Sequence, residues 1–158
     1  YAKDDLFEGA SFILTPVEET DPSAVEEVRA FALSLGFGKA VVSDPEEHDR
    51  IIAATSQLAH IVSNAYIKSP TLRHQAGFSA GSYQDLTRVA KLSEEMWTSL
   101  FLLNREALLF EVETIIGHLS QYRDALAAGN APELKGLLRE GRILKEEDIE
   151  RTAVRNQK

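Results

Sequence analysis

The stretch SEEMWTSLFLLNREALLFEVETIIGHLSQYRDALAA, residues 93–128, decides the fold of this chain. It contains no proline and a single glycine, Gly117, and its large apolar residues recur at the spacing of an α-helix. Between Leu100 and Phe110, apolar side chains fall on every side of such a helix. A helix that is apolar all round is buried all round. The pattern therefore predicts one long helix that a partner subunit covers.

Further helices are predicted on both sides of this stretch, so we expect a mainly α protein. Apolar residues at helical spacing indicate a helix over residues 51–66, and another is expected to start at Leu86. The segment 73–82 is rich in glycine, serine and alanine and is expected to be a loop. Pro132 is expected to begin a short amphipathic helix, followed by a frayed polar end of about ten residues.

The first 44 residues have a different pattern. Residues 9–15 and 39–43 are β-leaning runs, and between them Asp21-Pro22 marks the start of a helix that Gly36 ends. A strand-helix-strand unit cannot cover both faces of a sheet alone, so we expect a larger sheet outside this chain.

Composition and charge exclude several classes of protein. Of 158 residues, 44% are hydrophobic and 27% charged, as in a globular domain. The net charge of −8 argues against non-specific nucleic-acid binding, and no apolar run approaches the roughly 20 residues that cross a bilayer. The lack of cysteine fits a reducing compartment, so we expect a cytoplasmic protein. The chain begins at Tyr1 without a signal peptide, and we expect it to be a piece of a longer protein.

Motifs for a cofactor or a metal are weak. The segment Gly36-Phe-Gly38 lacks the third glycine of a dinucleotide fingerprint and lies between a helix and a strand, the reverse of the required order. His48 and His60 are twelve residues apart, about 18 Å along a straight helix, and so cannot share a metal ion. Ser56 and His60 share a helix face, but each imidazole alone is typical of a surface or packed side chain. We therefore expect no metal site and no cofactor site in this chain.

Arg88 is the main candidate for anion binding. It follows the glycine-rich segment and is expected one turn into a helix, where a guanidinium suits a bidentate contact with a carboxylate. An ion pair with Asp85, three residues earlier, explains the same residue equally well. Trp97 fits a core position better than the wall of a ligand site.

Several segments, in this order, resemble the C-terminal portion of prephenate dehydrogenase. They are HD at 48–49, SQLAH at 56–60, GSYQDLTRVA at 81–90, MW at 96–97 and NR at 104–105. That family oxidises and decarboxylates prephenate to 4-hydroxyphenylpyruvate on the way to tyrosine. The resemblance implies that residues 1–44 end a nucleotide-binding Rossmann domain. It also implies that residues 45–158 form an all-helical dimerisation and substrate-binding domain, similar to the C-terminal domain of 6-phosphogluconate dehydrogenase.

The resemblance implies roles for individual residues. Arg88 matches the arginine that holds a substrate carboxylate. Six others match positions that line the interdomain cleft or surround the pocket: His48, Ser56, His60, Gly81, Asp85 and Trp97. Gln57 and Ala59 depart from the family pattern, because many relatives have histidine and proline there. Without the proline, the helix is expected to be straighter.

By the same resemblance, NAD or NADP and the catalytic histidine belong to the missing N-terminal half. We therefore expect no catalytic residue and no dehydrogenase activity in this chain alone. It would bind prephenate and form a homodimer through residues 93–128, without nucleic-acid or membrane partners. Two alternatives stay open: an all-helical mutase or lyase that acts on a similar dianion, and a non-enzymatic helical dimer module that senses an aromatic amino acid.

Overall fold

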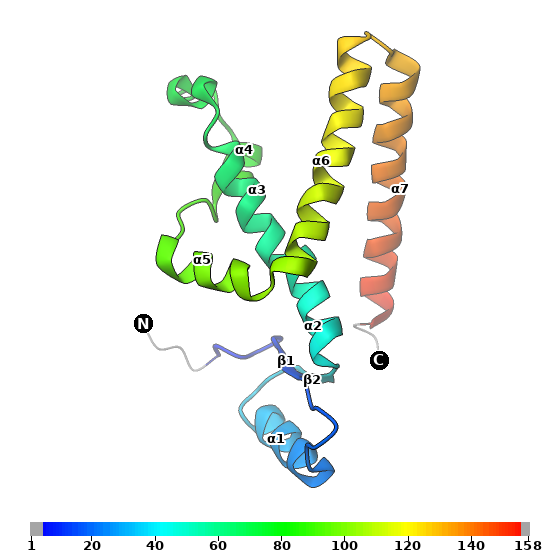
Figure 1. The fold of residues 1–158 in the computed structure, drawn as a ribbon. Helices are drawn as coiled ribbons and strands as arrows, with labels where there is room; N and C mark the ends of the chain where they lie inside the picture. Colours follow the sequence, from blue (N-terminus) through cyan, green and yellow to red (C-terminus); the bar gives the residue numbers. More distant parts are fainter. Residues whose placement is uncertain (1–4, 156–158) are drawn as a thin grey trace. The chain divides into compact units, whose positions relative to one another are not determined.

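The computed structural model describes residues 5–155, with side chains up to Ala153 (Figure 1). Helices make up most of this part of the chain, as the sequence predicts. The chain divides after Leu109 into two compact units, each of which is described by itself.

The first unit begins with the predicted strand-helix-strand segment. Strand β1 (Ser11–Leu14) pairs in parallel with β2 (Lys39–Val42), and helix α1 (Pro22–Ser34) connects them. Gly36 adopts a φ of 94° just after α1, a conformation that favours glycine, so the predicted helix stop is confirmed. The two strands are the whole of the sheet within residues 5–155.

Two aspartate-proline pairs begin helices, because the aspartate side chain satisfies a free amide of the first turn. Asp21 accepts hydrogen bonds from the amide and the hydroxyl of Ser23, at 2.8 and 2.9 Å, and these bonds lower the pKa of its carboxyl. Asp44 accepts a hydrogen bond from the amide of Glu47, at 2.7 Å, at the start of α2 (Pro45–Ile52).

The helix expected over residues 51–66 is present, but it is interrupted by a wider turn. Helix α2 passes into a π-helical turn, η1 (Ala53–Gln57), and then into α3 (Leu58–Tyr66). In this turn the amide of Leu58 donates to the carbonyl of Ala53, five residues earlier. The helix is therefore not regular at this place, and the expectation that it is straighter than in relatives with proline stays a prediction. Such turns are rare and are often found at functional sites.

Residues 93–128 form two helices, so the prediction of one long helix is wrong. Helix α5 (Glu94–Leu103) ends at Asn104, whose φ of −108° and ψ of 33° are not helical, and α6 (Arg105–Ala127) follows. The apolar run is thus shared between two helices. This division explains why its side chains seemed to surround a single axis.

The segment that carries Arg88 also differs from the expectation. After a 3₁₀ turn, η2 (Pro70–His74), helix α4 (Gly81–Thr87) begins inside the segment that was expected to be a loop. Arg88 follows the last residue of α4 rather than lying one turn into a helix.

The second unit consists of α6 from Phe110 onward and α7 (Ala131–Arg155), which form an antiparallel hairpin (Figure 1). Gly129, with a φ of 60°, makes the turn, and the amide of Asn130 donates to the carbonyl of Ala125 at 2.9 Å. The expectation of a short helix is wrong, because α7 has 25 residues and continues to Arg155; the last three residues of the expected frayed end lie outside the described residues. Ion pairs at helical spacing, such as that between Arg142 and Glu146, favour this exposed helix by a few tenths of a kcal/mol each.

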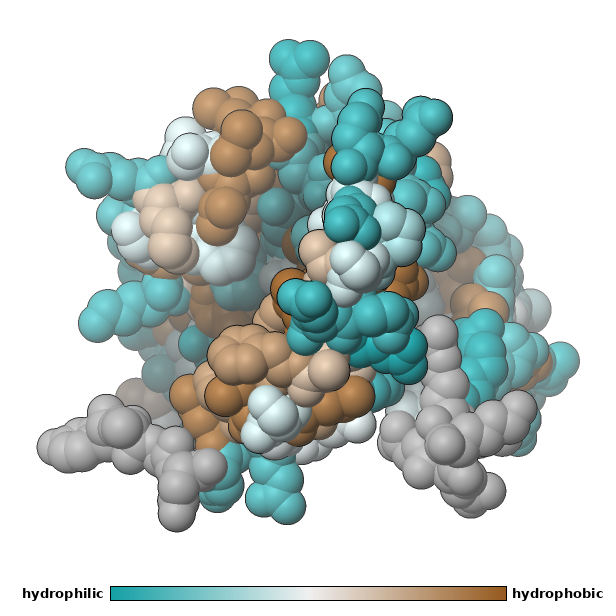
Figure 2. Space-filling view, turned by 90° about the horizontal axis from the view of Figure 1, so that it is seen from below, coloured by the Kyte–Doolittle hydropathy of each residue, from teal (hydrophilic) through white to brown (hydrophobic). Residues whose placement is uncertain are grey.

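Much apolar surface lies outside the core. The buried hydrophobic residues among those described are few and mostly small: Ala32, Ala53, Leu108 and Ala125. Along α6, Phe110, Ile116, Leu119 and Leu126 each expose 55–66% of their surface. Figure 2 shows apolar side chains gathered in patches on one face. Patches of this kind mark surfaces that bind another protein or domain.

The cap of α2 gives a first prediction. We expect Asp44→Ala to lower the free energy of unfolding by about 0.5–2 kcal/mol, because it leaves the amide of Glu47 without its acceptor. Asp44→Asn keeps an acceptor at the same position and should stay close to the unchanged chain. Urea denaturation of the three proteins measures the effect. Equal midpoints for all three would contradict this role of Asp44.

Candidate functional site

A histidine stacked on a tryptophan forms the centre of the candidate site. The rings of His60 on α3 and Trp97 on α5 have centroids 3.9 Å apart and planes 29° apart. Phe101, one turn further along α5, lies 5.3 Å from Trp97 between ring centroids. The expectation that Trp97 is core is therefore only partly met, because this half-buried indole packs on an imidazole.

The contacts of His60 fix which ring nitrogen is free. Its Nδ1 lies 2.8 Å from the carbonyl oxygen of Ser56. A carbonyl oxygen can only accept a hydrogen bond, so Nδ1 donates and Nε2 remains as an acceptor in the neutral ring. When the ring is protonated, Nε2 becomes a donor suited to an anion. The predicted pairing of Ser56 and His60 on one face is thus present, through the backbone of Ser56 rather than its hydroxyl.

A cleft of about 380 Å³ lies beside Trp97 and is lined by both polar and apolar residues. Its charged side chains are Lys91 and Glu94, and Asn64 donates a hydrogen bond to the carbonyl of Ala90 at 3.1 Å across its wall. The lining consists of Asn64, Ala90, Lys91, Leu92, Glu94, Trp97, Thr98 and Phe101. A small molecule with an apolar ring and polar groups matches this mixture.

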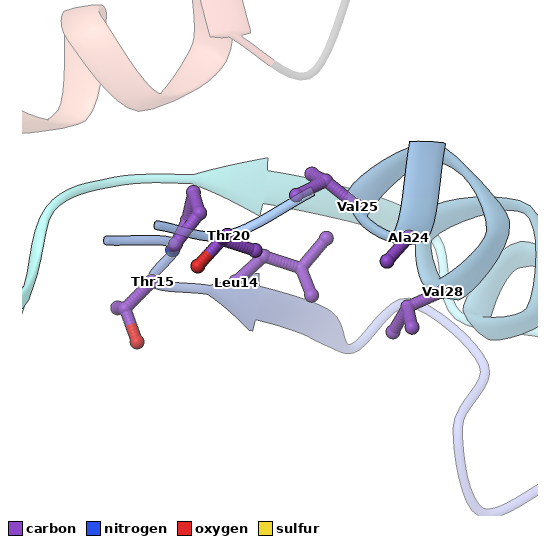
Figure 3. Close-up of a pocket in the computed structure, with 7 residues that line it drawn as sticks. Leu14, Thr15, Thr20, Ala24, Val25 and Val28 are labelled. Carbon is purple, nitrogen blue, oxygen red and sulfur yellow. The ribbon is translucent and has the colours of Figure 1, made fainter. Parts of the chain in front are cut away.

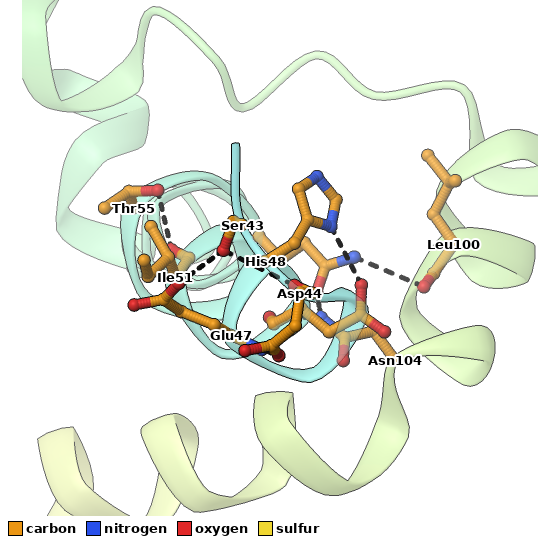
Figure 4. A network of polar contacts seen from close by, with 10 residues as sticks. Ser43, Asp44, Glu47, His48, Ile51, Thr55, Leu100 and Asn104 are labelled. Carbon is orange, nitrogen blue, oxygen red and sulfur yellow. Dashed lines mark hydrogen bonds and ion pairs between the residues drawn. The ribbon is translucent and has the colours of Figure 1, made fainter. Parts of the chain in front are cut away.

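A polar network joins α2 and the π-helical turn that follows it to the end of α5 (Figure 4). The Nδ1 atom of His48 lies 3.0 Å from a carboxylate oxygen of its neighbour Asp49. Gln57, only 6% exposed, donates to the carbonyl of Leu100 at 3.3 Å and accepts from the side chain of Asn104 at 2.8 Å. The Asn104 amide also donates to the carbonyl of Asp49 at 2.8 Å.

The structure brings together only some of the residues singled out in the sequence. Ser56, His60 and Trp97 meet in one cluster. Gly81, Asp85 and Arg88 all lie on or just after α4 and are exposed. Asp85 and Arg88 form no ion pair with each other, so the side chain of Arg88 is not held by that contact.

Sequence reasoning gave no structural role to three amides that build the site, namely Gln57, Asn64 and Asn104, although Gln57 and Asn104 were noted in the comparison with the family pattern. A signal was available for Asn104, because it is a polar residue in the middle of the apolar run from Leu100 to Phe110. A polar side chain within such a run must find partners if it is buried. No comparable signal marks Gln57 or Asn64, whose partners are distant in the sequence.

A second pocket, of about 220 Å³, lies where β1 ends beside α1 (Figure 3). Its lining contains no titratable side chain: Leu14, Thr15, Pro16, Thr20, Ala24, Val25 and Val28. In Figure 3 the side chains of Leu14, Val25 and Val28 point into the space between strand and helix. This pocket offers apolar packing but no group for acid, base or nucleophilic chemistry.

The part of the chain that the structure describes has neither a cluster of metal ligands nor a membrane-spanning helix. Within residues 5–155, no three histidine, cysteine or acidic side chains come together in a way that would hold a metal ion. None of the helices in that part of the chain combines the length and the hydropathy needed to cross a membrane.

Curated proteins and solved structures similar to this chain bear the names prephenate, cyclohexadienyl and arogenate dehydrogenase. Prephenate dehydrogenase of Bacillus subtilis is 30% identical over an alignment of 141 residues, and the match covers 84% of this chain and 37% of that protein. Cyclohexadienyl dehydrogenase of Zymomonas mobilis is 31% identical and matches 78% of this chain and 44% of its own length. The crystal structure of prephenate dehydrogenase from A. aeolicus in complex with hydroxyphenyl propionate and NAD+ has a TM-score of 0.78 and 28% identity. That match covers 93% of this chain and 53% of the other.

The chain thus spans 37–53% of the length of these three proteins. The sequence model of the prephenate dehydrogenase dimerization domain matches residues 44–140, which hold α2 to α6, the stacked pair and the cleft. These matches agree with the mainly α fold and with the resemblance found in the sequence. The chain belongs to the prephenate dehydrogenase family, and the greater part of it is the dimerization domain of that family.

Proposed function

We propose that this chain is the dimerisation and substrate-binding part of an NAD- or NADP-dependent prephenate dehydrogenase of the cytoplasm. The observation that carries the proposal is the stacked pair of His60 and Trp97 beside a cleft of mixed polarity, within the residues that match the family. In this proposal residues 1–44 end the nucleotide-binding domain and residues 45–158 form the helical domain.

Prephenate carries two carboxylates and a ring hydroxyl, and each needs a partner in the site. In the reaction, a base takes the hydroxyl proton, a hydride leaves the same ring carbon, and loss of carbon dioxide makes the ring aromatic. NAD or NADP, bound mainly by residues outside this chain, would accept the hydride. The catalytic histidine also belongs to that other part, so this chain binds and orients the substrate.

His60 and Arg88 are the residues proposed to meet the substrate anions. The free Nε2 of His60 can accept a hydrogen bond from a hydroxyl or, when the ring is protonated, donate one to a carboxylate. Arg88 is exposed and can bind a carboxylate through two parallel hydrogen bonds. His48, Ser56, Gly81, Asp85 and Trp97 are proposed to complete the pocket. The alternatives of a helical mutase or lyase and of a sensor module are not favoured, because the similar proteins are dehydrogenases.

The partner is proposed to be a second copy of this chain, bound through residues 93–128. Phe110, Ile116, Leu119 and Leu126 expose more than half of their surface along α6. Burying the exposed parts of these four side chains would contribute on the order of 4–7 kcal/mol. A two-fold axis buries the same face of both subunits, and symmetric dimers are the commonest assembly.

The first test of this function compares the chain with the full-length protein. We expect the full-length protein to oxidise prephenate with NAD or NADP. We expect the chain of 158 residues to show no turnover and negligible cofactor binding by calorimetry. The reason is that it has no glycine-rich turn from a strand into a helix, where a dinucleotide phosphate would be held. Micromolar cofactor binding by the chain alone would contradict the domain assignment.

The second test concerns Arg88. In the full-length protein we expect Arg88→Ala to lower kcat/KM for prephenate roughly 10- to 150-fold, mainly through KM, because a charge-assisted contact is worth about 1.5–3 kcal/mol. Arg29→Ala is the matched control, since Arg29 pairs with Glu26 on the surface of α1. Steady-state kinetics measures both. Equal kcat/KM values for the two variants would remove Arg88 from the site.

The third test concerns the dimer. We expect sedimentation at low micromolar concentration to give about twice the chain mass of 17.5 kDa. Leu119→Glu should shift the protein towards the monomer, because it places a charge in the apolar face of α6. Gln121→Glu adds the same charge about 200° further around the helix and should leave the dimer intact. A folded monomer of the unchanged chain would overturn the proposed interface.

A further inference from the structure

Two side-chain amides, one buried and one half-buried, connect the helices on which His60 and Trp97 lie. Gln57 sits in the π-helical turn, and Asn104 is the residue at which α5 ends. The amide of Asn104 donates both to Gln57 Oε1 and to the carbonyl of Asp49, each at 2.8 Å. Gln57 in turn donates to the carbonyl of Leu100 at 3.3 Å. We call Gln57 and Asn104, with these hydrogen bonds, the amide clamp.

The amide clamp and the stacked pair lie next to each other along the same two helical segments. Gln57 contacts the backbone at Leu100. His60, three residues after Gln57, contacts Trp97, three residues before Leu100. The two segments therefore run antiparallel at this contact, with the clamp one turn from the stack. The clamp therefore contacts α5 at the turn that follows Trp97.

A glutamine suits this position for a chemical reason. Its side chain is neutral and offers one donor and one acceptor at once, which the carbonyl of Leu100 and the amide of Asn104 both require. At 6% exposure, water does not readily replace a lost partner. An apolar side chain of the same size fills the space but leaves the amide of Asn104 without one acceptor.

We propose that Gln57 and Asn104 are positioning residues, which hold Trp97 against His60 and thereby set the direction of the free Nε2 of His60. The statement that Nε2 is directed towards substrate rests on the function proposed above. The coupling between clamp and stack is a property of the chain itself and does not need a substrate. The two parts can therefore be tested separately.

Fluorescence reports on the stack directly, because Trp97 is the one tryptophan of the sequence. A protonated imidazole in contact with an excited indole quenches it more strongly than a neutral imidazole does. The readout of the test is the amplitude of the loss of tryptophan emission between alkaline and acidic pH, not the pH at its midpoint. The midpoint also depends on charges around the cleft and on nearby helices, namely Lys91, Glu94, Arg88 and the pair of His48 and Asp49.

We expect the unchanged chain to lose emission on acidification and His60→Leu to lose most of that change. Gln57→Leu and Asn104→Ala, both with His60 present, should also lose most of the amplitude. Gln57→Glu is the conservative variant. It keeps an acceptor for Asn104 and, once protonated, a donor for Leu100, so it should keep the low emission of the unchanged chain at acidic pH.

Two controls separate position from stability. Asp44→Ala weakens the fold at the cap of α2 without touching the clamp, and Ser63→Ala removes a buried hydroxyl on α3 that has no hydrogen-bond partner. Both should keep the full amplitude. If Gln57→Leu does not fold, Asn104→Ala and Gln57→Glu carry the test. Full amplitude in folded Gln57→Leu or Asn104→Ala, or its loss in Asp44→Ala, overturns the inference.

The second part of the test uses the full-length protein and prephenate. We expect Gln57→Leu to lower kcat more than it raises KM, since a misdirected Nε2 still offers a contact but loses the geometry of the transition state. If the clamp variants change the fluorescence but the unchanged full-length protein does not oxidise prephenate, the proposed function fails and the clamp stands. If oxidation occurs and the clamp variants keep the amplitude, the clamp fails and the function stands.

Discussion

The hydrogen bonds of Asn104 are the contact on which the helical part of the first unit depends. Because its side chain is held by Gln57 and by the backbone of Asp49, Asn104 leaves the helical conformation and separates α5 from α6. Helix α5 then packs along the π-helical turn and α3, where Trp97 meets His60. An uninterrupted helix through this residue would give Asn104 a different backbone conformation and so disturb these contacts. The side-chain amide of Asn104 thus links the end of a helix to the place where an imidazole is stacked.

Short-range signals explain which parts of the fold the sequence predicts. The caps at Asp21 and Asp44 and the stop at Gly36 act within a few residues, and each lies where expected. The break at Asn104 escapes such reasoning because its partners are 47 and 55 residues away. The length of α7 escapes it for another reason: charged pairs along an exposed helix leave no apolar stripe to read.

The same division applies to the candidate site. The shared face of Ser56 and His60 follows from their spacing, but the stack with Trp97 depends on how two helices pack, which spacing does not contain. The assignment to the prephenate dehydrogenase family agrees with the resemblance found in the sequence and gives the cluster a chemical context. The roles of all seven site residues in substrate binding remain predictions. Within the described residues, no hydrogen bond, ion pair or ring contact joins His48, Gly81, Asp85 or Arg88 to the stacked pair.

The π-helical turn at Ala53–Gln57 constrains how this segment can change in length during evolution. Such a turn holds one residue more than an α-helix would use over the same rise. Deleting a residue there would restore a regular α-helix and keep the flanking side chains nearly on their present faces, whereas a deletion within α3 would turn all preceding side chains by about 100° relative to those that follow. His48 and the capping Asp44 would then face away from their present neighbours. A one-residue difference in length between proteins that keep this arrangement is therefore expected at the π-helical turn rather than in the helices on either side of it.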